Sequence, residues 1–365
     1  MRIKKISLHN YRNYSHLSLD LSHNLNIFLG ENAQGKTNII EAIYYAAIGS
    51  SHRTSNDSEL ICWEKESAKI YLCFERMSVE NELEFNFPVG KRREISYNGH
   101  KIKPKELIGT INVVLFSPED LYLIKGAPAA RRKFLDTEIS QANPSYYSLL
   151  SQYNRVTTQR NVLLKKIKEN QAKVDLLELW NQQLSELATK IVKQRIYSLK
   201  KLNMLANLMH RRISTNKENL EIGYIFNGEE NFLPSDLNTW YNNKLAEVQA
   251  IDIRRGFTSV GPHRDDIILK VNGINLRSFG SQGQQRTGVL ALKLAELEFI
   301  KSETGEYPVL LLDDVMSELD VNRRNQLLLF IRERIQTFIT ATDRSYFPKE
   351  NVGKYYKVSA GSVME

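Results

Sequence analysis

The chain has 365 residues and a mass of 42.2 kDa, which is enough to bury one large core or two moderate ones. Its composition, with 42% hydrophobic and 25% charged residues, is that of a soluble globular protein. Two cysteines are too few for a disulfide framework, and the absence of an apolar leader or a run of roughly 18 apolar residues argues against a membrane span. We therefore expect a cytoplasmic protein with no membrane segment.

The formal net charge is +8, and the positive charge is concentrated in one segment. Between Lys125 and Arg212 there are 17 Lys and Arg but only 6 Asp and Glu. A basic surface attracts polyanions, and nucleic acid is the usual one because its binding releases counterions. A solvated helical surface is the alternative interpretation of such a charge run.

β-Strand patterns dominate residues 2 to about 115. The β-rich segments are RIKKISL, LNIFL, KIYLCFE, ELEFNF, REISYNGHKI and INVVLF. Asn98-Gly99 predicts a hairpin turn inside this region.

A phosphate-binding loop of the pattern G-x-x-x-x-G-K-[ST] lies among these strands. Its residues are Gly30, Glu31, Asn32, Ala33, Gln34, Gly35, Lys36 and Thr37. In this pattern backbone N–H groups surround phosphate oxygens, the lysine reaches the β- and γ-phosphates, and the threonine hydroxyl binds Mg²⁺. The preceding run LNIFL predicts a strand, and TNIIEAIYYAAIG predicts a helix that ends at Gly49 and directs its N-terminal dipole at the phosphates. These flanks argue against an ordinary glycine turn.

From about residue 120 to 250 the apolar residues recur at helical spacing, as at Leu184, Leu187 and Ile191. This region predicts an inserted helical lobe. Its prominent basic residues are Arg131, Arg132, Lys133, Lys165, Lys166 and Lys168. Few aromatic residues lie among them, which favours contact with phosphates over base stacking.

After Gly256 the β pattern returns with DDIILKVNGINL, which contains a second hairpin signal at Asn272-Gly273. YPVLLLDD and TFITAT then predict buried strands. In a chain with a phosphate loop, Asp313 is expected beside the Mg²⁺ ion, and Asp314 where a catalytic base orients the attacking water. Taken alone, PVLLLDD is equally well a buried strand with a polar exit.

Ser281, Gly283 and Gln284 precede an amphipathic helix, where a hydroxyl and free N–H groups would form an anion site. A polar turn with a helix cap is the alternative. For Trp63, Trp180 and Trp240 we expect packing roles, and we expect no metal cluster at His263–Asp266.

The order of the phosphate loop, SQGQQ, LLLDD and SELD (317–320) resembles the ATP-binding-cassette plan of the SMC and chromosome-repair ATPases. Within that group the chain resembles the RecF family of bacterial recombinational-repair proteins nearly end to end. The motifs that carry this resemblance are NYRNY, GSSHRTSNDSELI, FSPEDLYLIKGAPAARRKFLD, VGPHRDD and SQGQQRT. It implies an α/β fold, with an ABC-type ATPase head (a mixed sheet with the phosphate loop) from residues 1–118 and 251–365, carrying a helical insert at 119–250.

The resemblance also implies an ATP-dependent homodimer with Mg²⁺ as a cofactor. Ser281, Gly283 and Gln284 of one subunit would complete the nucleotide site of the other, and Asp320 would be a cross-subunit contact. The basic insert would bind double-stranded DNA and single/double-strand junctions. Partners would be RecR/RecO-type mediator proteins that help to load a recombinase at single-strand gaps.

Three positions depart from the cassette pattern. Asp313-Asp314 replaces the usual Asp-Glu, and the shorter side chain predicts a slow ATPase. FITATD (338–343) lacks the usual histidine, and FSPEDL (116–121) lacks the usual glutamine. Two alternatives use the same loop: a P-loop kinase or phosphotransferase acting on a small substrate, and the ATPase subunit of a membrane transporter.

Overall fold

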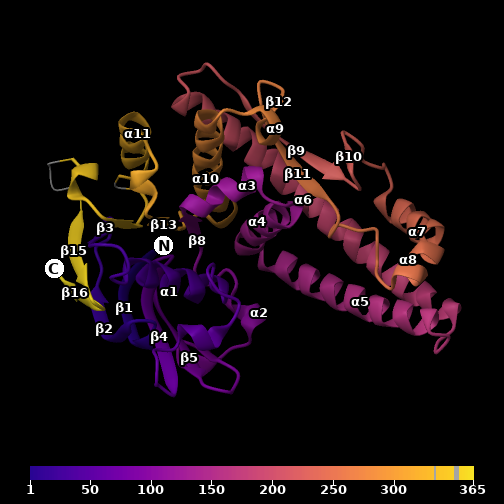
Figure 1. Cartoon of the computed structure of the whole chain (residues 1–365), viewed down its shortest axis with the longest axis horizontal. Helices are drawn as coiled ribbons and strands as arrows, with labels where there is room; N and C mark the ends of the chain where they lie inside the picture. The colour runs from indigo at the N-terminus through magenta and orange to yellow at the C-terminus, as the bar shows by residue number, and fades with distance from the viewer. Residues whose placement is uncertain (333, 349–352) are drawn as a thin grey trace. The chain divides into compact units, whose positions relative to one another are not determined.

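The computed structural model describes residues 1–332, 334–348 and 353–365 (Figure 1). These residues form two compact units. The first unit comprises Met1–Asp120 and Glu296–Glu365, and the second comprises Leu121–Ala295. Within the described part of the chain, no helix is both long enough and apolar enough to cross a bilayer.

The first unit contains two six-stranded sheets. One sheet is antiparallel, with the strand order β2 (Tyr14–Asp20), β1 (Arg2–Tyr11), β4 (Ser67–Arg76), β5 (Val79–Pro88), β6 (Glu94–Tyr97) and β7 (His100–Lys101). The other has the order β16 (Ser362–Met364), β15 (Lys354–Ser359), β3 (Leu25–Leu29), β14 (Thr337–Ala341), β13 (Val309–Asp313) and β8 (Val113–Phe116). Its strands are parallel except for the edge strand β16, so the predicted mixed sheet is confirmed.

Helix α1 (Lys36–Ile48) lies between these two sheets. It packs on β4 and β5 of the antiparallel sheet and on β8, β13 and β14 of the parallel one. Its sequence is apolar on nearly every side, as expected for a helix buried in the core. Gly49 ends the helix in a left-handed conformation (φ 77°), and its N–H donates to the carbonyl of Tyr45. The predicted strand, loop and helix are therefore confirmed. The unit also contains α2 (Pro104–Leu107) and α11 (Val321–Ile331).

The second unit is mainly helical. The long helices α5 (Pro144–Lys168) and α6 (Leu177–Ile213) pack side by side (Figure 1). A four-stranded sheet has the order β10 (Glu229–Glu230), β9 (Leu220–Phe226), β11 (Asp266–Val271) and β12 (Ile274–Asn275). β9 packs on α6, and β11 packs on α4 (Pro128–Ala142). The remaining helices are α3 (Tyr122–Lys125), α7 (Leu237–Glu247), α8 (Gln249–Arg255) and α9 (Leu276–Phe279), and α10 (Gln282–Thr304) contains the division between the units.

The second unit extends further along the chain than the predicted insert, 119–250. The reason is strand pairing, because β11 pairs along its whole length with β9, which lies inside the predicted insert. Helix α8 likewise packs on α5. The chain therefore leaves this unit within α10 rather than at residue 251, whereas the first division, at 120/121, lies close to the predicted 118/119.

Both predicted Asn-Gly hairpins are confirmed. Asn98-Gly99 joins β6 to β7, and Asn272-Gly273 joins β11 to β12, with φ angles of 49° and 78° in each turn. The expectation that Trp63 is a packing residue was wrong, because its side chain is 92% exposed. Trp240 does pack, with its ring 4.7 Å from that of Phe226.

Buried ion pairs hold the second unit together. Arg160 of α5 and Asp252 of α8 are both 0% exposed, and their Nη1 and Oδ2 atoms lie 2.8 Å apart. Arg160 also donates to Asn181 of α6 and to Thr258 (2.8 and 2.9 Å). This one guanidinium therefore connects two long helices with the segment that follows α8.

We expect Arg160→Met to lower the free energy of unfolding of this unit by about 3–5 kcal/mol, because the carboxylate of Asp252 would remain buried without its counter-ion. Urea denaturation followed by circular dichroism measures the change. Lys244→Met is the control, since the exposed pair of Lys244 and Glu247 should contribute at most about 1 kcal/mol. Equal losses in the two variants would contradict a structural role for the buried pair.

Candidate functional site

The phosphate-binding loop connects β3 to α1 at the carboxyl end of the parallel sheet. Lys36 folds back over this loop, and its Nζ donates hydrogen bonds to the carbonyl oxygens of Gly30 (2.6 Å) and Glu31 (2.7 Å). Burial lowers the pKa of Lys36, and the carboxylates of Asp314 and Asp313 oppose that shift. Both acceptors of the ammonium group are neutral carbonyl oxygens. An ammonium group forms stronger hydrogen bonds with anionic phosphate oxygens than with such neutral acceptors.

Two glycines of the loop are required by the close approach of neighbouring chain. A Cβ on Gly30 would overlap with the carbonyl oxygen of Val358 in β15. Gly35 has φ 116°, and a Cβ there would lie 2.6 Å from Nδ2 of Asn13 and 2.8 Å from the hydroxyl of Tyr14. Only glycine fits both positions, as the loop pattern predicts.

Residues at the turn between β1 and β2 form hydrogen bonds with the phosphate-binding loop. The hydroxyl of Tyr14 donates to the carbonyl of Gly35 (3.1 Å), and Nδ2 of Asn13 donates to the carbonyl of Gln34 (2.9 Å). The side chain of Gln34 accepts the N–H of Ala360, in the turn between β15 and β16 (2.7 Å). The side chains of Glu31, Asn32 and Ala33 are exposed, and Ala33 has a left-handed conformation (φ 64°). Sequence reasoning missed the support from Asn13 and Tyr14, although both lie in the NYRNY motif.

The end of β13 meets the start of α1 at the predicted magnesium position. The hydroxyl of Thr37 donates to Oδ1 of Asp313 at 2.9 Å. Thr340 of β14 donates to the same oxygen at 2.7 Å, and its Oγ1 accepts the N–H of Asp314 at 2.9 Å. A hydroxyl and a carboxylate side by side are the oxygen ligands that Mg²⁺ prefers, so the residues present fit this ion. Thr340 was not assigned from the sequence, although it lies in FITATD, the segment in which the cassette histidine is missing.

Asp314 has an unusual backbone for a residue that is not glycine. Its φ and ψ are 54° and 23°, a left-handed conformation directly after β13. Its Oδ1 is buried and is hydrogen-bonded by none of the residues in the described ranges. Burial raises the pKa of Asp314, with Lys36 opposing the shift and Asp313 and Glu318 adding to it. A strained, partly desolvated carboxylate beside the phosphate loop fits the expected base.

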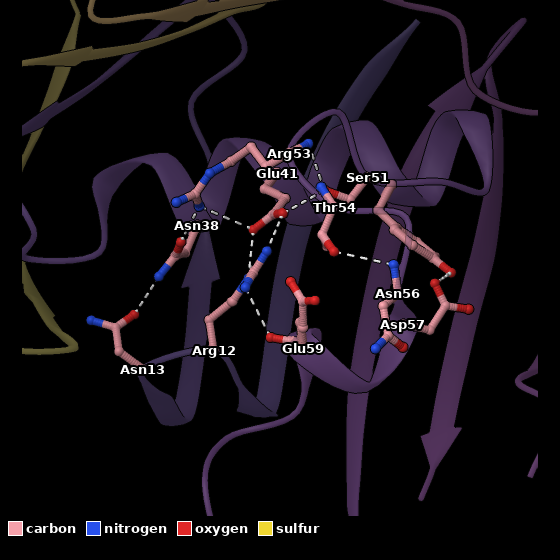
Figure 2. A network of polar contacts seen from close by, with 11 residues as sticks. Arg12, Asn13, Asn38, Glu41, Ser51, Arg53, Thr54, Asn56, Asp57 and Glu59 are labelled. Carbon is pink, nitrogen blue, oxygen red and sulfur yellow. Dashed lines mark hydrogen bonds and ion pairs between the residues drawn. The ribbon is translucent and has the colours of Figure 1, made fainter. Parts of the chain in front are cut away.

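A buried carboxylate links α1 to the two segments beside it (Figure 2). Glu41 is fully buried and accepts two hydrogen bonds from Arg12 (2.9 and 2.7 Å), one from Ser51 (2.5 Å) and one from Arg53 (3.3 Å). Arg53 also donates to Oδ1 of Asn38 (2.8 Å). Burial alone would raise the pKa of Glu41, but these donors and the two guanidinium charges lower it overall. The carboxylate is therefore ionised and fixes both arginines to the phosphate-loop helix.

The SQGQQ segment (281–285) lies in the second unit, at the start of α10. Ser281 and Gln284 form a reciprocal cap, in which Gln284 N donates to Ser281 Oγ (3.2 Å) and Ser281 N donates to Gln284 Oε1 (3.0 Å). Gln284 also donates to Glu218 (2.8 Å). Ser281 and Gly283 are exposed. In a single chain, this segment therefore forms a helix cap, the alternative to an anion site.

Asp320, the expected cross-subunit contact, and Asp343, at the end of the FITATD segment, also cap helices. The carboxylate of Asp320 accepts the N–H of Arg323 (2.9 Å) at the start of α11. Asp343 caps the short 3₁₀ helix η5 (Arg344–Tyr346) through the N–H of Ser345 (2.7 Å).

The six basic residues assigned to DNA have different environments. Lys133, Lys165, Lys166 and Lys168 are exposed, the last three at the end of α5. Arg132 is half-buried and donates to the carbonyl of Asp265 (2.8 Å). Arg131 is only 4% exposed and forms two hydrogen bonds with the carboxylate of Asp266 (2.8 and 2.7 Å). The structure thus gives Arg131 an internal role, and we remove it from the candidate DNA contacts.

The VGPHRDD motif is held inside the second unit by similar contacts. Asp265 accepts a hydrogen bond from Tyr224 (2.6 Å), and Nδ1 of His263 lies 2.6 Å from the hydroxyl of Tyr153. Burial lowers the pKa of His263 to about 4, so the ring is neutral at pH 7.

Fold and loop geometry together define a P-loop ATPase head of the RecF and SMC type. Residues 2–362 match the family described as RecF/RecN/SMC N terminal domain. The Smc head bound to the C-winged helix domain of ScpA has a similar fold, with a TM-score of 0.59 at 15% identity, 100% of this chain and 96% of that one being covered.

Closer relatives specify the family. The chain is 47% identical over 371 residues to the DNA replication and repair protein RecF of Halothermothrix orenii, and 45% identical over 368 residues to that of Clostridium beijerinckii; each match covers 100% of this chain and 98% of the relative. A solved structure of the recombination mediator protein RecF with ATP, in the RecFOR pathway, has a TM-score of 0.92 at 38% identity, with 100% and 97% of the two chains covered. The chain belongs to the RecF family.

We expect Gly35→Ala to lower the free energy of unfolding by about 1–3 kcal/mol more than Gly90→Ala. Both glycines have positive φ, but a Cβ on Gly90 would meet no heavy atom within 4 Å among the described residues, whereas one on Gly35 would press on Asn13 and Tyr14. Urea denaturation of the two variants gives the difference. Similar losses of unfolding free energy in the two variants would mean that Asn13 and Tyr14 move aside at little cost.

Proposed function

We propose that this protein is an ATP-dependent DNA-binding clamp that acts in DNA replication and recombinational repair, as a recombination mediator. The observation that carries the proposal is the convergence of Lys36, Thr37, Asp313 and Asp314 at one edge of the parallel sheet, in a chain of the RecF family. The solved RecF structure with ATP is a close relative, which supports ATP as the nucleotide.

Each residue of the loop has a defined task in this proposal. Backbone N–H groups of residues 30–37 bind the phosphates, and Lys36 moves its hydrogen bonds from Gly30 and Glu31 to phosphate oxygens. Thr37 and Asp313 would hold Mg²⁺, which supplies charge neutralisation for the phosphates. Thr340 keeps the carboxylate of Asp313 in place.

Asp314 acts as the base that orients and deprotonates water. Its raised pKa brings the carboxylate closer to the range in which a base accepts a proton efficiently. Because Asp is shorter than the usual Glu, the carboxylate holds that water less closely, and we expect slow turnover. The enzymatic activity is therefore a weak, DNA-stimulated ATPase that releases the clamp.

Two subunits form the complete site in this proposal. The exposed start of α10, with Ser281 and Gly283, would meet the γ-phosphate bound by the partner's loop, because N–H groups at a helix N-terminus attract anions. Asp320 would lie along the same interface. ATP then joins the subunits, and its hydrolysis separates them.

We infer that the second unit supplies the DNA contacts. Lys165, Lys166 and Lys168 lie in the last turn of α5 and are exposed, which suits contact with phosphates of duplex DNA and of single/double-strand junctions. RecR/RecO-type mediators are the expected protein partners, in keeping with the RecFOR pathway of the solved relative. The kinase and transporter alternatives have no comparable support from the relatives.

Light scattering with ATP and DNA tests the clamp. We expect the wild type to dimerise only when both are present, Lys36→Ala to remain monomeric because it loses its phosphate contact, and Asp314→Asn to stay dimeric because hydrolysis is blocked. Lys65→Ala, at an exposed site of the same unit, should behave as the wild type. A wild-type protein that remains monomeric in the presence of both ATP and DNA would contradict the clamp model.

Changing Lys165, Lys166 and Lys168 together to Ala should weaken duplex binding about tenfold or more at moderate salt, equally for unrelated sequences. The slope of log affinity against log salt concentration should also become shallower by about 2–3. Fluorescence anisotropy measures both quantities. The matched control changes the exposed Lys101, Lys103 and Lys105 of the first unit. An affinity that does not vary with salt would rule out the electrostatic account.

A further inference from the structure

His52 lies in the loop after α1. Its two neighbours, Ser51 and Arg53, are both hydrogen-bonded to that helix (Figure 2). Ser51 Oγ donates to Glu41 (2.5 Å) and accepts the N–H groups of Arg53 (2.9 Å) and Thr54 (3.2 Å). The guanidinium of Arg53 donates to Asn38 and Glu41. Because these acceptors lie on the helix that begins at the phosphate loop, the backbone of His52 is held in a fixed position relative to that loop.

The ring of His52 packs on the face of α1 that carries Thr37. It contacts Tyr44 edge to face, with ring centroids 5.2 Å apart and an interplanar angle of 82°. Thr37, Glu41 and Tyr44 are spaced i, i+4 and i+7, so they share one face of the helix. Aromatic side chains on a helix lean toward its N-terminus, which here is the phosphate end.

One nitrogen of the ring lacks a partner. Nδ1 of His52 is buried, and no residue that the structure describes forms a hydrogen bond with it. Buried polar atoms in native proteins are nearly always hydrogen-bonded, and the described residues supply no partner for this nitrogen, so it is available to one from outside the chain.

The charged groups around the ring connect it to the nucleotide site. Burial lowers the pKa of His52, while the carboxylates of Glu41, Asp313 and Glu119 oppose the shift and Arg53 adds to it. The ring is therefore neutral at pH 7, with one nitrogen that donates and one that accepts. Asp313 is the expected magnesium ligand, and Glu119 lies in the segment that replaces the cassette glutamine.

We propose that His52 is a further residue of the nucleotide site, and that its Nδ1 hydrogen-bonds an oxygen atom there, from the bound nucleotide or from water that it orders. This inference rests on the proposed ATPase function. A phosphate oxygen only accepts, so it requires a protonated Nδ1, whereas an unprotonated Nδ1 accepts a hydrogen bond from water. His52 lies in the GSSHRTSNDSELI motif, in which sequence reasoning left nucleotide contact, DNA contact and a solvated loop as open alternatives.

Two substitutions separate this role from simple packing. His52→Phe keeps a ring against Tyr44 but removes the nitrogen, and His52→Asn removes the ring but keeps a polar atom near the place of Nδ1. We expect His52→Phe to lower kcat for ATP hydrolysis about tenfold with little change in KM, as for one lost hydrogen bond, and His52→Asn to stay within about threefold of the wild type. A packing role predicts the reverse order. His100→Phe, on an exposed edge strand, is the control.

Histidine ¹⁵N NMR provides a readout that does not depend on turnover. In the full chain, the signal lost in His52→Phe identifies the ring, and we expect its Nδ1 shift to change when Mg²⁺ and a non-hydrolysable ATP analogue are added. An unprotonated Nδ1 then identifies water as the partner, because a phosphate oxygen cannot donate, and ³¹P coupling or a phosphate-dependent shift of a protonated Nδ1 identifies phosphate. An unchanged Nδ1 shift, or a His52→Phe variant with normal kcat, would overturn the inference. If the wild type itself fails to bind or hydrolyse ATP, the proposed function fails instead.

Discussion

The candidate site depends on the burial of α1 between two sheets. A helix covered on both sides cannot shift without breaking the core, so its first residues, Lys36 and Thr37, have a fixed position. Thr37 is joined to Asp313 of β13, and Asp313 is joined to Thr340 of β14. Three neighbouring elements thus meet at the carboxyl edge of the parallel sheet, where ligands bind in open α/β folds. The precision of the site comes from the core beneath it.

Buried charges serve as connectors in both units. Glu41 joins α1 to Arg12 and Arg53, and Arg160 joins α5 to Asp252. Such pairs contribute little net stability because desolvation opposes their attraction, but breaking one leaves a costly isolated charge. They therefore penalise any arrangement in which the segments separate. In the first unit this fixes the loop that carries His52, and in the second it fixes the positions of the long helices.

These internal pairs also change how the charge of the second unit should be interpreted. Arg131, Arg160 and Arg195 contribute to its positive composition, yet all three are buried and bound to Asp266, Asp252 and Asp136. A count of charged residues cannot distinguish such connectors from surface cations. The exposed lysines at the end of α5 are therefore stronger support for the proposed DNA contact than the net charge itself.

The sequence alone determined the phosphate loop, its flanking strand and helix, both Asn-Gly hairpins and the resemblance to the RecF family, because these features depend on short-range patterns. Tertiary structure decided the rest. Only the fold places Asn13, Tyr14 and Thr340 around the loop, since they come from distant segments. Only strand pairing shows that β11 belongs with β9, beyond the predicted boundary at residue 251. Burial likewise distinguishes Arg131, which is inside the second unit, from Lys165, which is exposed. The two basic residues have similar sequence contexts, and only the packing of the folded chain makes them differ.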